Sequence, residues 1–238
     1  MLIIGHRGAS RAEAENTPAA FRTADRMGAD GVELDVRLAT GSDGVARLVV
    51  HHDPLPASPT ELDRLPGFDE VLEACGGRML VNVEIKNTDA DGGFDPSMAM
   101  VQPTLDAMRR SDPDPRRWLI SSFSIETVDR CRELAPEFAT AVLSHELDLE
   151  RIAAAVAGGH SAVHPWEQMV TADGVEAAHD AGLAVNVWTC NDSARLTELV
   201  EMGVDGVCTD VPDVALEAIG RDGTPRSDLR WGGPAGDG

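Results

Sequence analysis

The sequence predicts an α/β protein, and within that class a TIM (β/α)8 barrel with a short hairpin excursion after its second strand. Two observations predict it. Short β-type runs alternate with helical patterns over nearly the whole chain of 238 residues, which is typical of a parallel sheet covered by helices. Nine runs read as strands, one more than a closed barrel of eight needs, and one of them follows its neighbour too closely for a helical crossover.

The predicted strands are short runs rich in Val, Ile and Leu, at residues 2–5, 31–38, 47–52, 79–86, 118–123, 138–144, 161–165, 183–189 and 205–210. The predicted helices lie between them, at residues 17–28, 67–77, 96–111, 124–135, 147–159, 170–182, 192–203 and 211–220. Thr17 is a suitable N-cap for the first helix, Pro18 fits its first position and Gly28 ends it. Pro103 interrupts or kinks the helical pattern of 96–111.

The run 47–52 is the extra strand. Only the stretch "ATGSDGVA" separates it from the run 31–38, and Gly41, Asp43 and Gly44 make that link a turn. A parallel crossover needs a dozen or more residues, so this strand must return antiparallel. We therefore expect a hairpin that brings its terminal histidines back to the carboxyl ends of the barrel strands, where the chemistry of such barrels lies.

No linker divides the chain, so we predict one domain over residues 1–220. The tail 221–238 is rich in Gly, Pro and Asp, and we expect it to be disordered. The sequence carries no signal for an oligomeric state.

The chain is acidic, with a formal net charge of -21. Such a field repels nucleic acid and anionic membranes, so we expect no nucleic-acid partner and no stable membrane association. No signal peptide and no apolar run of about 18 residues is visible. The four cysteines are too far apart for a CxxC metal or redox pair and read as buried free thiols, which fits a cytoplasmic protein: Cys75, Cys131, Cys190 and Cys208.

Three acidic residues interrupt strands that should be apolar. Glu33 and Asp35 are two residues apart in "VELDV" and share one face, and Glu84 lies in "VNVEIK". Carboxylates at the ends of neighbouring barrel strands make a hard-oxygen site suited to Mg²⁺ or Ca²⁺. The alternative is a buried salt-bridge network with nearby cations, namely Arg7, Arg37 and Lys86, the only lysine of the chain.

Two strand-like runs end in histidine beside these acids. His6 is followed by Arg7, which can grip an anionic oxygen, and His52 is followed by Asp53, which can orient its ring. Lys86 can complement an oxyanion. Phe123 and Trp188, at other strand ends, form either an apolar pocket wall or ordinary packing.

These residues resemble the glycerophosphodiester phosphodiesterases. The stretches "GHRGAS…ENTPAAF", "GVELDVRL", "VVHHDPL", "VNVEIK", "VWTCND" and "GVDGVCTDVPD" follow that family's order over residues 3–213. The resemblance implies a TIM barrel and metal-dependent hydrolysis of small glycerophosphodiesters to sn-glycerol 3-phosphate and an alcohol. It implies the following roles: His6 and His52 as the acid/base pair; Glu33, Asp35 and Glu84 as metal ligands; Arg7 and Lys86 as phosphate contacts; and Glu15 as a supporting residue.

Two departures from the family pattern concern the segment around His52. The stretch after the His-Asp pair is short and lacks the family's Arg-Thr element, which leaves the preferred alcohol open. His51 stands where the family commonly has an apolar residue, and strand alternation turns it away from the side that His52 faces.

The expected mechanism is general acid/base hydrolysis, in which one histidine removes a proton from the nucleophile and the other protonates the leaving alcohol. The nucleophile is either the adjacent glycerol hydroxyl, through a cyclic phosphate, or water. Two other functions fit the same residues. One is a lysophospholipase D, which needs an apolar channel for an acyl chain. The other is a barrel that binds metal and phosphate without turnover.

Overall fold

The computed structural model describes residues 1–226 and 229–231, and it has the predicted TIM barrel. Eight parallel strands form the closed ring, with pairing of β1 to both β2 and β9 completing it. The strands are β1 (Leu2–His6), β2 (Gly31–Thr40), β4 (Leu80–Ile85), β5 (Trp118–Ser122), β6 (Ala139–Ser144), β7 (Ala162–Pro165), β8 (Ala184–Val187) and β9 (Gly206–Thr209).

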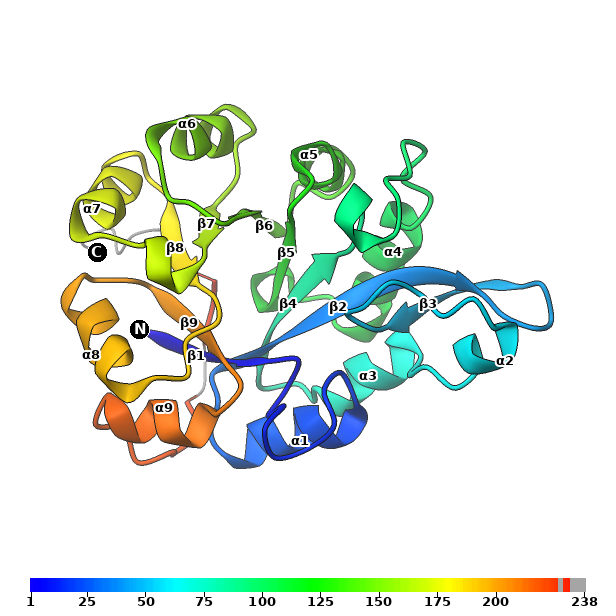
Figure 1. Ribbon diagram of the computed structural model, residues 1–238, viewed down its shortest axis with the longest axis horizontal. Coiled ribbons are helices and arrows are strands. Elements are labelled where there is room, and N and C mark those ends of the chain that lie inside the picture. Colours follow the sequence, from blue (N-terminus) through cyan, green and yellow to red (C-terminus); the bar gives the residue numbers. More distant parts are fainter. Residues whose placement is uncertain (227–228, 232–238) are drawn as a thin grey trace.

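Helices surround this ring (Figure 1). They are α1 (Pro18–Arg26), α2 (Pro59–Leu62), α3 (Phe68–Ala74), α4 (Val101–Ser111), α5 (Ile125–Leu134), α6 (Leu149–Ala157), α7 (Ala172–Asp180), α8 (Ser193–Glu201) and α9 (Pro212–Ala218). Short 3₁₀ turns lie at Asp89–Asp91, Pro115–Arg117 and Glu167–Met169. Among the described residues, no helix is both long and apolar enough to cross a bilayer.

Helix α1 begins and ends as predicted. The Thr17 hydroxyl accepts a hydrogen bond from the Ala20 amide at 3.3 Å, Pro18 occupies the first turn, and Gly28 follows the helix with a φ of +86°. Helix α4 differs, because it begins at Val101 rather than at residue 96. Pro103 therefore lies in the first turn, where its missing N–H would have had no intrahelical partner.

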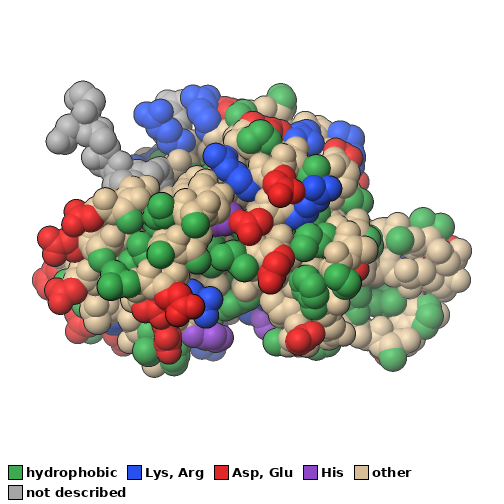
Figure 2. Space-filling view, turned by 90° about the horizontal axis from the view of Figure 1, so that it is seen from above, with side chains coloured by type: hydrophobic (Ala, Val, Ile, Leu, Met, Phe, Trp, Pro, Cys, Tyr) green, Lys and Arg blue, Asp and Glu red, His purple; other side chains and the backbone are tan. Residues whose placement is uncertain are grey.

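The extra strand is β3 (Ala46–Val50), and it pairs antiparallel with β2 from Val36↔Val50 to Thr40↔Ala46. This confirms the predicted hairpin. Figure 1 shows β2 and β3 leaving the ring as a long arm. Figure 2 shows the arm projecting from the body, with acidic side chains crowded at the opposite end of that face.

Strand β2 shows how the sequence positions the site. Val32, Leu34 and Val36 face outward into the apolar layer between strands and helices, where each is fully buried. Burying side chains of this size stabilises the fold by about 1.5–3 kcal/mol each. The alternation of a strand then turns the intervening Glu33 and Asp35 to the barrel interior.

Part of the expected C-terminal tail contacts the barrel. Arg221 forms an ion pair with Asp30 at 2.6 Å, and the Trp231 indole nitrogen donates to the Arg117 carbonyl at 3.0 Å. The remainder of the predicted disordered segment, residues 227–228 and 232–238, lies outside the described residues.

Candidate active site

A cavity of about 660 Å³ opens at the carboxyl ends of the barrel strands. The sequence-predicted residues His6, Arg7, Glu33, His52, Glu84, Lys86, Phe123 and Trp188 all line it. Two predicted residues lie beside it instead: Asp35 is buried behind the lining, and Glu15 is half exposed at its edge.

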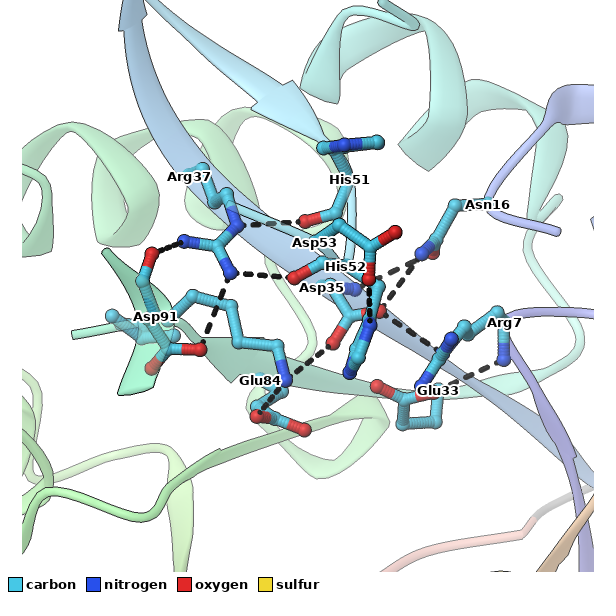
Figure 3. A network of polar contacts seen from close by, with 12 residues as sticks. Arg7, Asn16, Glu33, Asp35, Arg37, His51, His52, Asp53, Glu84 and Asp91 are labelled. Atoms are coloured by element: carbon cyan, nitrogen blue, oxygen red, sulfur yellow. Dashed lines mark hydrogen bonds and ion pairs between the residues drawn. The ribbon is translucent and has the colours of Figure 1, made fainter. Parts of the chain in front are cut away.

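Three carboxylates converge at the side of this cavity. Glu33, Asp35 and Glu84 each offer an oxygen within 4.8 Å of the others, and all three residues are buried. In the β2–β4 register, Asp35 pairs directly with Glu84, which explains why residues 49 positions apart meet. Figure 3 shows the three side chains turned toward one another next to the His52 ring.

Burial and the neighbouring charges shift the pKa values of these three carboxyls in different directions. Burial, reinforced by Asp35 and Glu84, raises the pKa of Glu33 well above its usual range. Burial also raises the pKa of Glu84 to about 7, although Lys86 opposes this shift. Burial acts in the same direction on Asp35, but Lys86 and Arg7 outweigh it and lower the pKa of that carboxyl.

The predicted salt-bridge alternative accounts for two of the three acids. The Lys86 ammonium lies 2.6 Å from Glu84 and 3.1 Å from Asp35. Within residues 1–226 and 229–231, the Glu33 side chain has no such cation and accepts only the Arg7 backbone N–H, at 3.0 Å. Its second oxygen, Oε1, is buried and has no hydrogen-bond partner among the described residues. Because an unpaired buried oxygen is costly, this oxygen fits a site for a positively charged ligand.

Arg7 is held tightly in an uncommon conformation. Its φ is +55°, a left-handed conformation that costs about 1–3 kcal/mol outside glycine, and Asn16 shares it at +58°. The Asn16 amide donates to the Arg7 carbonyl at 3.0 Å, and its side chain donates to Asp35 at 2.8 Å. The Arg7 guanidinium lies between Glu15 at 3.0 Å and Asp35 at 3.3 Å. Arg7 Nε makes an ion pair with Asp35 without hydrogen-bond geometry, so it still has a proton to donate.

Each predicted catalytic histidine has its own carboxylate. His52 Nδ1 lies 2.9 Å from Asp53, and burial lowers the pKa of His52, with Asp35 opposing and Lys86 assisting the shift. His6 Nδ1 lies 2.7 Å from Asp210. In both rings the carboxylate holds Nδ1, which leaves Nε2 for other partners.

Asp210 was missed by the sequence reasoning. It follows β9, as Asp53 follows the β3 arm, and this repeated strand-end acid is the signal that could have found it. Burial opposes its ionisation, but hydrogen bonds from His6, Asn191 and Ser10 outweigh burial and lower the pKa of Asp210 to about 2. The Asn191 amide donates at 2.7 Å, and its own oxygen accepts from Thr209 and from the Asp210 backbone.

Arg37 does not join the acids. Its guanidinium donates to the carbonyl of His51 at 3.0 Å, to that of His52 at 2.5 Å and to Asp91 at 2.6 Å. It therefore holds the end of the β3 arm against the loop that follows β4. In Figure 3 the His51 ring points away from the carboxylates, while the His52 ring points toward them.

An aromatic cluster lines the cavity at the ends of β5, β6 and β8. The rings of Phe123, His145 and Trp188 lie 5.5 Å from one another, centroid to centroid. The Trp188 indole donates to the His164 carbonyl at 2.8 Å, which fixes its orientation. His145 belongs to this wall, although no motif in the sequence marks it as a site residue.

A model of the glycerophosphoryl diester phosphodiesterase family matches residues 6–66 and 54–214. The chain belongs to this family. This confirms the predicted family and the predicted enzyme class, a phosphodiester hydrolase.

Proteins with related sequences and folds agree. A glycerophosphodiester phosphodiesterase of Caldanaerobacter subterraneus subsp. tengcongensis is 28% identical over 250 residues, covering 93% of this chain and 99% of the relative. A solved glycerophosphodiester phosphodiesterase of Agrobacterium tumefaciens is 27% identical with a TM-score of 0.70, covering 91% of this chain and 99% of that one. An Oleispira antarctica phosphodiesterase, solved with the product sn-glycerol-3-phosphate, shares the fold with a TM-score of 0.82 at 23% identity, covering 92% and 96% of the two chains.

Proposed function

We propose that this protein hydrolyses small glycerophosphodiesters to sn-glycerol 3-phosphate and an alcohol, using a divalent metal ion and two histidines. The observation that carries the proposal is the buried carboxylate cluster with its unpartnered Glu33 oxygen, in one cavity with His6 and His52. The sn-glycerol-3-phosphate in the Oleispira antarctica phosphodiesterase supports the choice of substrate class.

The donor set fits a hard divalent ion, Mg²⁺ or Ca²⁺. Glu33, Asp35 and Glu84 supply only oxygen ligands, and their separation of 4.8 Å or less can close around one ion. A bound ion supplies Lewis-acid polarisation of a phosphoryl oxygen and lowers the pKa of a coordinated hydroxyl.

The two histidines move the protons. Asp210 holds Nδ1 of His6 and Asp53 holds Nδ1 of His52, so Nε2 of each ring is the atom that exchanges a proton. One Nε2 takes the proton of the nucleophile, which is the adjacent glycerol hydroxyl or water. The other returns a proton to the leaving alcohol oxygen.

Arg7 and Lys86 bind the phosphate. Both side chains are largely buried and line the cavity, so their charges act on a substrate with little screening from water. Glu15 supports this role by orienting the Arg7 guanidinium through two 3.0 Å contacts. Phe123 and Trp188 provide the apolar wall against which the organic part of the diester packs.

We also propose a single domain in the cytoplasm with no stable membrane association, whose barrel spans residues 1–220 and is contacted by Arg221 and Trp231. The four cysteines are free thiols, three of them buried, which suits a reducing compartment.

The test is the release of glycerol 3-phosphate from a panel of diesters, after chelation and after Mg²⁺ or Ca²⁺ is added back. We expect activity to require the ion, and His6→Ala and His52→Ala to remove turnover while metal binding persists. Lysophosphatidylcholine as a parallel substrate tests the lysophospholipase D alternative. Metal binding without release from any diester would instead identify a non-catalytic barrel.

A further inference from the structure

The layer of the barrel interior nearest the amino-terminal ends of the strands is built from unusually small side chains. Ala141, Ala162 and Ala184 stand side by side on β6, β7 and β8 in direct register, and all three are buried. With Leu119 they form an apolar cluster of their own at the amino-terminal half of these strands. Such layers are usually filled by bulky Val, Ile or Leu, so three neighbouring alanines leave room for a side chain from elsewhere.

Trp231 fills this room from the C-terminal segment. It packs against the alanine cluster, and its indole N–H donates at 3.0 Å to the carbonyl of Arg117, which directly precedes β5. In Figure 1 the red segment 229–231 lies close to β8, the strand that carries Ala184. Trp231 also lines the same cavity as His6 and Glu84. The cavity therefore runs down the barrel axis from the catalytic groups to this indole.

Residues 221–226, which precede Trp231 in the chain, bind at the amino-terminal end of the barrel. Arg221 binds both oxygens of Asp30, at 2.6 and 2.8 Å, and Arg226 lies 3.7 Å from the same carboxylate. Asp30 is fully buried and also accepts the Ile3 amide of β1 at 2.9 Å. The backbone of Gly223 approaches Gly28 so closely that a Cβ at Gly28 would collide with it.

We propose that residues 221–226 and 229–231 form a plug that closes the amino-terminal end of the barrel, with Trp231 as the floor of the active-site cavity. Trp231 is a positioning residue, since it seals the cavity without touching the reacting atoms. The proposal goes beyond the proposed reaction, and it holds for any ligand that enters from the carboxyl end.

Two full-length chains test the plug, the wild type and Trp231→Ala, and both keep the arginines that bind Asp30. Each carries Ala162→Cys as a reporter, and the same two chains without this substitution correct for labelling of native thiols. A small methanethiosulfonate reagent should modify the reporter at least about tenfold faster in the Trp231→Ala chain, because removal of the indole opens the site. This measurement needs no substrate, so it is independent of whether the proposed reaction is right.

Thermal unfolding provides a second readout. Loss of a packed Trp should lower the Tm of the Trp231→Ala chain by about 6–12 °C. Trp231→Phe is the matched control, since it keeps an aromatic ring and should keep the reporter protected. Equal labelling rates and equal Tm values in the wild type and Trp231→Ala would overturn the proposal. If Trp231→Ala does not fold, Trp231→Leu decides, with faster labelling supporting the plug and unchanged labelling refuting it.

Discussion

Replacing Asp210 by Asn tests the role of the carboxylate that holds His6. The substitution keeps the shape of the side chain but removes its charge. Asn191 makes the outcome specific, because its amide donates to Asp210 Oδ2 while its own oxygen is already occupied by Thr209. The new amide must therefore turn its oxygen to Asn191 and its NH₂ group to His6. That arrangement places the imidazole proton on Nε2, so the ring can no longer take a proton there.

The magnitude follows from two contributions. A pKa lowered from 3.8 to about 2 corresponds to roughly 2 kcal/mol in favour of the ionised carboxylate, shared among three donors. Loss of the charged hydrogen bond between His6 and this carboxylate accounts for about 1 kcal/mol of that stabilisation, which corresponds to roughly fivefold in rate. The reversed tautomer removes general acid/base function from this ring, which contributes about 10²–10⁴-fold. We therefore expect kcat/KM to fall by at least about 10²-fold, with the fall mainly in kcat.

The assay is glycerol 3-phosphate release at saturating metal, with Asp53→Asn as the matched control. Asp53 is 75% exposed, so water replaces its interaction with His52 and the control should lose less than about tenfold. Asp210→Asn activity within threefold of the wild type would refute the reasoning. So would a greater loss in Asp53→Asn than in Asp210→Asn.

Three further predictions concern the surroundings of the site. Arg37→Ala removes the hydrogen bonds to the His51 and His52 carbonyls. It should lower the free energy of unfolding by about 2–3 kcal/mol, measured by urea denaturation. It should also reduce kcat, measured as turnover at saturating substrate. Burial lowers the pKa of His164 to about 3, so its neutral form is favoured in the fold and stability is lost as pH falls below 6.5. At pH 5 this loss of unfolding free energy is about 2 kcal/mol. In His164→Asn the unfolding free energy should therefore fall less between pH 7 and pH 5 than in the wild type. An equal fall in both proteins would contradict the prediction. Ca²⁺ or Mg²⁺ at about 100 times its Kd should stabilise the wild type by about 2.7 kcal/mol in thermal unfolding, and Glu84→Gln should reduce this gain.

The sequence predicted those features that depend on local chemistry. Thr17, Pro18 and Gly28 mark the ends of α1 by their own backbone and capping preferences. The turn residues Gly41 and Gly44 predict the β3 return, because no crossover helix fits between the two strands. Glu33 and Asp35 are conspicuous because charged residues on a buried strand need a reason.

Features that depend on barrel closure were not predictable in this way. Asp210 meets His6 across 204 positions, and only the pairing of β9 with β1 brings them together. Trp231 packs against the alanine cluster of the barrel, although it lies in a stretch whose composition is typical of a disordered tail. Arg37 belongs to the same face of β2 as Glu33 and Asp35. It lies where β2 leaves the ring, however, so it contacts the end of the β3 arm instead of those two carboxylates.

The two neighbouring histidines at the end of the β3 arm make the register of the β2–β3 hairpin a condition of the chemistry. A shift of that register by one residue would turn every side chain of β3 to the opposite face, so His51 instead of His52 would face the carboxylates. Val49 and Val50 are buried in separate apolar clusters, and the same shift would take both out of them. Apolar packing along the arm therefore decides which of the two imidazoles serves the site.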